Sequence, residues 1–176
     1  MTTNDLRSQM GMFRRVELPS GVTGLLLLHS MPGRNEPLEN VWREIRNTRI
    51  DCIVSLASRR EIREKSPDYA DAIAAGRVPC DRLEFPITDF GVPEDRPAFY
   101  TLARDLATRL RAGQRLLIHC GAGIGRTGTL ATCVLVALGE PLESAKRSVS
   151  AAGSSPETAE QRELIAWCAH QAGEAP

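Results

Sequence analysis

The chain has 176 residues, of which 42% are hydrophobic and 25% charged, and its 22 basic side chains balance its 22 acidic ones. This length predicts one domain with a substantial core. The lack of net charge argues against nucleic acid or a membrane surface as a partner. The five cysteines show no C-x-x-C spacing, which argues against a disulfide framework or a zinc site. We expect no metal and no cofactor.

The N-terminal residues 1–21 are polar and lack the apolar segment of a signal peptide. The leucine run at residues 25–28 is far too short to span a bilayer. We therefore expect a cytoplasmic protein with a flexible tail at residues 1–12 and a single folded domain at residues 13–176.

Short apolar runs alternate with amphipathic stretches along the chain. Strands are expected at residues 24–29, 50–58, 82–87 and 116–120. Helices are expected at residues 37–50, 66–76, 96–113, 128–138, 141–150 and from 157 or 158 to 168. This alternation predicts a single α/β domain whose central, mostly parallel sheet of four to five strands is flanked by helices.

Residues 116–130, LLIHCGAGIGRTGTL, combine an apolar strand, a glycine-rich turn and an apolar helix. We call residues 120–126 of this stretch the cysteine loop. Its three glycines allow the backbone to curl and turn several N–H groups to one centre, which suits a tetrahedral oxyanion. The N-terminus of the following helix and the guanidinium of Arg126 add positive charge, and the same field favours the thiolate form of Cys120.

Three other interpretations of the cysteine loop are less favoured. Gly123 to Gly128 also fits the dinucleotide pattern G-x-G-x-x-G, but no acidic residue at the end of a second strand follows about 20 residues later. A Walker A loop would need glycine in place of Cys120 and lysine in place of Arg126. A buried structural cysteine would not require Arg126, Thr127 and three glycines around it.

The stretch HCGAGIGRTG resembles the H-C-x5-R-[ST]-G signature of the cysteine-dependent protein phosphatases. Its flanks resemble the dual-specificity and cyclin-dependent-kinase-associated branch of that family, and so do the segments FPITDFGVPED and MPGR. The resemblance covers residues 21–167. It implies that residues 13–176 form a phosphatase domain.

The resemblance implies a two-step hydrolysis of phosphomonoesters. Cys120 would attack phosphorus, Asp89 would protonate the departing oxygen, and Thr127 would donate its hydroxyl to the sulfur. His119 would hold the loop backbone, and Gln161 would orient a water. The phosphate itself would be held by the amides and side chain of Gly121, Ala122, Gly123, Ile124, Gly125 and Arg126.

Several assignments have local alternatives. Glu94 and Asp95 compete with Asp89 for the acid, although they fit the first turn of the next helix better. Asp89 could also form a turn with its own backbone, and Gln161 is almost equally expected to face solvent.

A cluster of arginines follows the strand expected at residues 50–58. Arg59, Arg60 and Arg63 either guide an anionic substrate or pair with nearby glutamates on a solvated helix face.

The cysteine loop carries no lysine, whereas the loops of inositide-directed relatives do. The chain also has no separate tyrosine-recognition loop, so a shallow and permissive cleft is expected. We therefore expect a dual-specificity type of protein phosphatase whose partner is a phosphorylated protein, with a monomer as the simplest state. The alternative is a catalytically silent module that binds phosphorylated partners.

Overall fold

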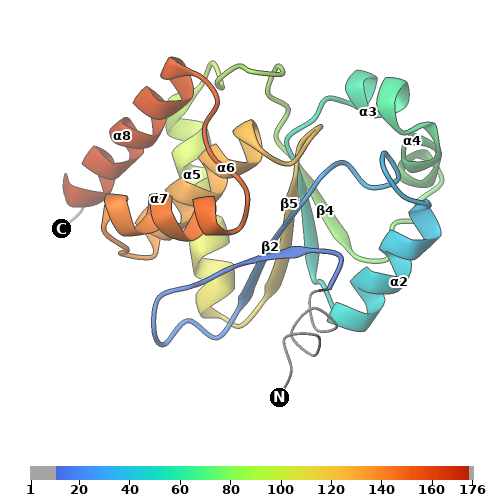
Figure 1. Ribbon diagram of the computed structural model, residues 1–176, viewed down its shortest axis with the longest axis horizontal. Helices are drawn as coiled ribbons and strands as arrows, with labels where there is room; N and C mark the ends of the chain where they lie inside the picture. Colours follow the sequence, from blue (N-terminus) through green and yellow to red (C-terminus); the bar gives the residue numbers. More distant parts are fainter. Residues whose placement is uncertain (1–10, 175–176) are drawn as a thin grey trace.

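The computed structural model describes residues 11–174, so the expected tail at residues 1–12 lies almost entirely outside the described residues. The strands are β1 (Arg14–Val16), β2 (Leu25–His29), β3 (Cys52–Ser55), β4 (Asp81–Glu84) and β5 (Arg115–His119). The helices are α2 (Leu38–Thr48), α3 (Arg59–Lys65), α4 (Pro67–Ala74), α5 (Arg96–Arg111), α6 (Gly125–Ala137), α7 (Leu142–Ala151) and α8 (Ala159–Glu174). Figure 1 shows them as a single α/β unit, as expected.

Within residues 11–174, one sheet of five strands has the order β1-β2-β5-β3-β4. The pairs β2–β5, β5–β3 and β3–β4 are parallel, and among these strands only the edge strand β1 is antiparallel to its neighbour. The mostly parallel sheet is therefore confirmed. Because β5 lies in the middle, the cysteine loop leaves the centre of the edge where the parallel strands end.

The sheet separates two hydrophobic cores. In β2 the buried Leu26 and Leu28 belong to one core and Leu27 to the other, as the alternation of side chains along a strand requires. Helices α5 to α8 cover the first face, and α2, α3 and α4 cover the second (Figure 1). Both faces of the central strands are buried, which explains their nearly continuous apolar sequences.

Helix α6 lies at the centre of the first face. It is buried on almost all sides and packs against α5, α7 and α8. The next element along the chain is helix α7 and not a strand, so the dinucleotide-binding arrangement is absent from residues 11–174. No helix in this range is long and apolar enough to cross a membrane.

Three local differences from the expected elements matter for the site. Strand β1 was not predicted, because three residues reading RRV carry no recognisable alternation. Helix α3 had no bounds in the sequence prediction, and Ser58 caps it by accepting a hydrogen bond from the Glu61 N–H at 3.1 Å. Helix α6 begins at Gly125, three residues earlier than expected, inside the cysteine loop.

Candidate active site

The cysteine loop connects the buried end of β5 to the first turn of α6. Ile124, the N-cap residue of α6, makes no side-chain capping hydrogen bond. The first N–H groups of a helix have no partner within the helix, so this turn offers free donors and a partial positive charge. An anion in the loop would bind to these donors.

Donors outside the loop hold three of its carbonyl groups. The Met31 N–H donates to the Gly121 carbonyl at 3.0 Å, and the imidazole of His119 bonds the Cys120 carbonyl at 3.0 Å. The Gly123 carbonyl accepts two further hydrogen bonds at 2.6 Å, from side chains outside the loop. A peptide's N–H points opposite to its C=O, so the N–H groups that follow these carbonyls face the other side, where a phosphate would bind.

His119 is fully buried and is held in one tautomer. Because Nδ1 faces the Cys120 carbonyl, it carries the proton, and Nε2 accepts from the Tyr69 hydroxyl at 3.0 Å. The Tyr69 oxygen accepts in turn from Arg82 Nε at 3.1 Å. Burial lowers the pKa of His119 to about 4, against a smaller opposing effect of the Cys120 carbonyl. His119 is therefore neutral near pH 7 and fixes the backbone rather than exchanging protons.

The loop requires glycine at position 123. Gly123 has φ of +74°, and a Cβ there would lie 2.3 Å from the backbone oxygen of His29. A Cβ on Gly125 would lie 2.1 Å from Oε2 of Glu157, but that exposed side chain can move away. The loop is therefore pressed against the end of β2, and a side chain at Gly123 would force it open.

Cys120 and Arg126 lie at the bottom of the site, 3% and 2% exposed. Arg126 Nη1 donates to Glu61 Oε2 and to the Ile87 carbonyl, each at 2.8 Å. Its Nη2 donates to Glu61 Oε1 at 2.9 Å and to Asp89 Oδ1 at 3.0 Å. Both terminal nitrogens are thus fully engaged, so a phosphate that binds them must replace a partner.

Glu61 of α3 holds the guanidinium on one side. Burial raises the pKa of Glu61, but hydrogen bonds from Arg126 and Lys65 outweigh this effect and lower it to about 2. Lys65 Nζ donates to Glu61 Oε1 at 2.8 Å, which keeps the carboxylate in place. Glu61 was expected to pair with arginines of its own helix face, and that expectation was wrong.

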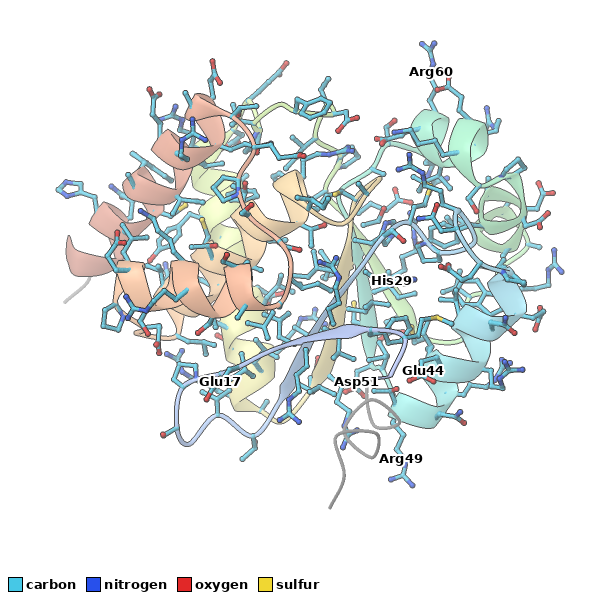
Figure 2. All side chains as sticks on the ribbon, in the orientation of Figure 1. Glu17, His29, Glu44, Arg49, Asp51 and Arg60 are labelled. Carbon is cyan, nitrogen blue, oxygen red and sulfur yellow. The ribbon has the colours of Figure 1, made fainter. Side chains whose placement is uncertain are left out.

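Arg59 and Arg60 of α3 pair with glutamates rather than with the cysteine loop. Arg60 pairs with Glu64 at 2.9 Å and extends into solvent at the top of α3 (Figure 2). Arg59 pairs with Glu84 at 3.1 Å. These contacts favour the solvated-face interpretation, and the cation that reaches the loop from α3 is Lys65.

Asp89 is the movable partner of Arg126. Its side chain is 47% exposed, and its Oδ2 lies 3.8 Å from Lys65 Nζ. Oδ1 also accepts from the Phe90 N–H at 3.1 Å, so the turn-forming contact and the contact with Arg126 coexist. The competitor Asp95 instead caps α5, accepting from the Ala98 N–H at 2.9 Å.

Gln161 and Thr127 are both buried, and they differ in their hydrogen bonds. Gln161 is completely buried rather than solvent-facing. Its Oε1 accepts from the Glu157 N–H at 2.7 Å and its Nε2 donates to the Gly91 carbonyl at 3.1 Å, so it ties the Asp89 segment to α8. Both ends of the amide are occupied in this way. The hydroxyl of Thr127 is buried and makes no hydrogen bond within residues 11–174.

Sequence reasoning assigned no role at the loop to four residues that contact it or its supports. Glu61 and Lys65 reach it from α3, Arg14 from β1, and Ser154 from the connection between α7 and α8. Glu61 and Lys65 carried a local signal, because both follow the C-terminal end of a parallel strand. Arg14 and Ser154 carried none.

Comparison with known proteins agrees with this geometry. A family model described as the Swiss Army Knife protein, DSP-PTPase phosphatase domain, matches residues 22–172. Among curated proteins, none matches the chain.

Solved structures share the fold. One is kinase associated phosphatase with its catalytic-site cysteine changed to serine, at 21% identity and TM-score 0.76 over 96% of this chain and 99% of that one. Tk-PTP in its active form matches at 27% identity and TM-score 0.67, over 90% of this chain and 97% of that one. PTPMT1 in complex with PI(5)P matches at 16% identity and TM-score 0.66, over 93% and 97% of the two chains.

Proposed function

Because the chain belongs to the Swiss Army Knife family of DSP-PTPase phosphatase domains, we propose that it is a protein phosphatase for phosphotyrosine and for phosphoserine or phosphothreonine. One observation carries the proposal. Arg126, which ends the loop that begins at Cys120, lies 3.0 Å from the carboxylate of Asp89. A phosphate in the loop would thus lie beside both a nucleophile and an acid.

In the first step the Cys120 thiolate attacks phosphorus, so an S–P bond forms while the bond to the leaving oxygen breaks. Asp89 gives its proton to that oxygen, because an alkoxide or phenoxide leaves poorly without protonation. Arg126 and the loop amides bind the equatorial oxygens, where the transition-state charge is spread. To do so, Arg126 exchanges the Asp89 oxygen for a phosphate oxygen.

In the second step water attacks phosphorus and the S–P bond breaks. Asp89, now a carboxylate, takes a proton from the water. The hydroxyl of Thr127 is available to donate to the departing sulfur, since it makes no hydrogen bond with residues 11–174. The products are inorganic phosphate and the regenerated thiolate. Gln161 would orient this water, because its Nε2 carries a second N–H besides the one that donates to the Gly91 carbonyl.

Exposed apolar side chains near the acid and in the loop favour an aromatic substrate. Phe90 is 60% exposed and follows Asp89 directly, and Ile124 is 37% exposed within the cysteine loop. Large exposed hydrophobic residues close to a site supply contact area for a substrate ring. We therefore expect phosphotyrosine to be hydrolysed faster than phosphoserine.

The surroundings of Lys65 indicate whether the site could bind a phosphoinositide, which carries additional phosphates. Its Nζ lies 3.1 Å from where a Cβ of Gly121 would stand, so a cation does adjoin the loop. However, Glu61 and Asp89 both face this ammonium, at 2.8 and 3.8 Å. With its charge already matched, Lys65 offers little for an additional phosphate, which favours a substrate with one phosphate.

The test is steady-state hydrolysis of p-nitrophenyl phosphate by the freshly reduced protein, followed by a panel of phosphopeptides and phosphoinositides. We expect steady turnover that Cys120→Ser abolishes, while Cys80→Ser, a change at a partly buried cysteine outside the loop, leaves it intact. Absence of turnover by the wild type, with phosphate binding retained, would support the silent binding module instead. Faster hydrolysis of inositides than of phosphopeptides would overturn the substrate class.

A further inference from the structure

Arg14 contacts the cysteine loop, although it belongs to none of the sequence motifs described above. It belongs to the edge strand β1, far from the loop in sequence. Its Nη2 donates to the Gly123 carbonyl at 2.6 Å, and its Nη1 donates to the Ala152 carbonyl and to Ser154 Oγ, each at 3.0 Å. Ser154 Oγ donates to the same Gly123 carbonyl at 2.6 Å. One guanidinium therefore joins β1, the loop and the segment after α7.

These hydrogen bonds fix the orientation of the peptide between Gly123 and Ile124. Two donors hold its carbonyl on the side away from the proposed phosphate, so its N–H faces the phosphate side. Gly123 can adopt this orientation because its φ is +74°, and the His29 backbone oxygen leaves no room for a side chain. The Ile124 N–H depends on this peptide orientation to reach an anion.

Arg14 also contributes charge. Burial lowers its pKa, and the electrostatic attraction of Cys120 partly opposes that effect. A guanidinium that donates to the Gly123 carbonyl adds to the positive field of α6 and Arg126 at the loop.

Resting on the proposed function, we infer that Arg14 is a positioning residue for phosphate. It holds the Gly123–Ile124 peptide in the orientation that binds an oxyanion. It touches neither substrate nor the reacting atoms, and it acts through the loop.

A purely structural role would have a different result. Strand β1 already pairs with β2 along its whole length and buries Val16 completely. These backbone and packing contacts hold the strand without the Arg14 side chain. Loss of that side chain should therefore change anion binding more than it changes stability.

The experiment measures inhibition by tungstate, a tetrahedral oxyanion, together with kcat, KM and thermal stability. We compare wild type, Arg14→Met, Arg14→Lys and the matched control Arg15→Met, which alters the exposed neighbour on the same strand. Arg14→Met should weaken tungstate inhibition and raise KM about 10- to 100-fold, the value of charge-assisted hydrogen bonds. Arg15→Met should stay within about twofold.

The conservative variant and the split between KM and kcat separate positioning from structure. Arg14→Met should raise KM more than it lowers kcat, and Arg14→Lys, which keeps one donor, should fall between Arg14→Met and wild type. A residue that only supports the fold would lower the melting temperature and leave tungstate inhibition of the folded protein unchanged. Tungstate inhibition of Arg14→Met within twofold of wild type would overturn the inference.

Ser154→Ala supplies an independent measurement if Arg14→Met fails to fold. Arg14 and Ser154 both donate to the Gly123 carbonyl. The effects of Ser154→Ala and Arg14→Lys on tungstate inhibition should therefore not be additive in a double-mutant cycle. Additive effects would show that the two do not act through the Gly123 carbonyl, and the inference would fall. If wild type neither hydrolyses aryl phosphate nor binds tungstate, the proposed function itself fails, which is a distinguishable result.

Discussion

Asp89→Asn separates chemistry from binding at this site. Asparagine keeps the shape of the side chain but cannot give a proton to the leaving oxygen. Loss of a general acid lowers kcat by roughly 10²- to 10⁴-fold. This is equivalent to about 3–5 kcal/mol of activation free energy.

Asp89→Asn should lower the stability of the fold only slightly, and it should strengthen the binding of anions. The Asp89 side chain is 47% exposed, so its contact with Arg126 contributes at most about 1 kcal/mol to folding. For a domain of this size the melting temperature should fall by no more than about 4 °C. Asp89 competes with phosphate for Arg126, so removing its charge should tighten tungstate binding by up to about fivefold.

The assay compares p-nitrophenyl phosphate with phenyl phosphate, whose leaving group needs protonation more. The loss of kcat should be larger for phenyl phosphate. Asp95→Asn is the matched control, because asparagine caps α5 as well as aspartate does. A kcat for Asp89→Asn within fivefold of wild type on phenyl phosphate, or a larger loss in Asp95→Asn, would refute the assignment.

Three further predictions concern the surroundings of the loop. Glu61→Gln leaves the buried guanidinium of Arg126 without its principal anionic partner, so the free energy of unfolding should fall by about 2 kcal/mol in urea titrations and kcat/KM by at least about tenfold. Gly123→Ala places a Cβ 2.3 Å from the His29 oxygen, and tungstate inhibition should be lost while the far-ultraviolet circular dichroism stays unchanged. His119 has a folded pKa of about 4, below its unfolded value, so the unfolded state binds the proton first as pH falls. Stability should therefore drop by roughly 2 kcal/mol between pH 7 and pH 5 in urea titrations, and His119→Gln should lose most of this dependence.

The parts of the site that are contiguous in the chain could be predicted from sequence. Cys120 and Arg126 are separated by five residues, and three of these are glycine, so their spacing and the apolar flanks already predict a strand, an anion-binding turn and a helix. A carboxylate beside the loop was predictable because the carboxyl ends of parallel strands meet at one edge of the sheet, but the choice of Asp89 over Glu94 and Asp95 came from the family resemblance. The alternation of strands and helices likewise predicted the parallel sheet.

Tertiary structure alone decided which distant side chains surround the loop. Glu61 lies on a helix rich in charges at i, i+4 spacing, and such charges ordinarily pair within their own helix. Its contact with Arg126 exists because α3 packs against the sheet with this residue beside the loop. The sequence also left open whether Gln161 faces solvent. The packing of α8 against α6 decides this, because it buries the amide, which donates to the Gly91 carbonyl.

Arg14 was the least predictable of these residues from sequence, because β1 is a strand only through its pairing with β2. Local spacing along the backbone determines how a glycine-rich turn curls, so the cysteine loop is encoded in a few consecutive residues. Long-range partners depend on which faces of the elements pack together. That choice minimises the free energy of the whole chain, and for Arg14 and Ser154 it leaves no local pattern in the sequence.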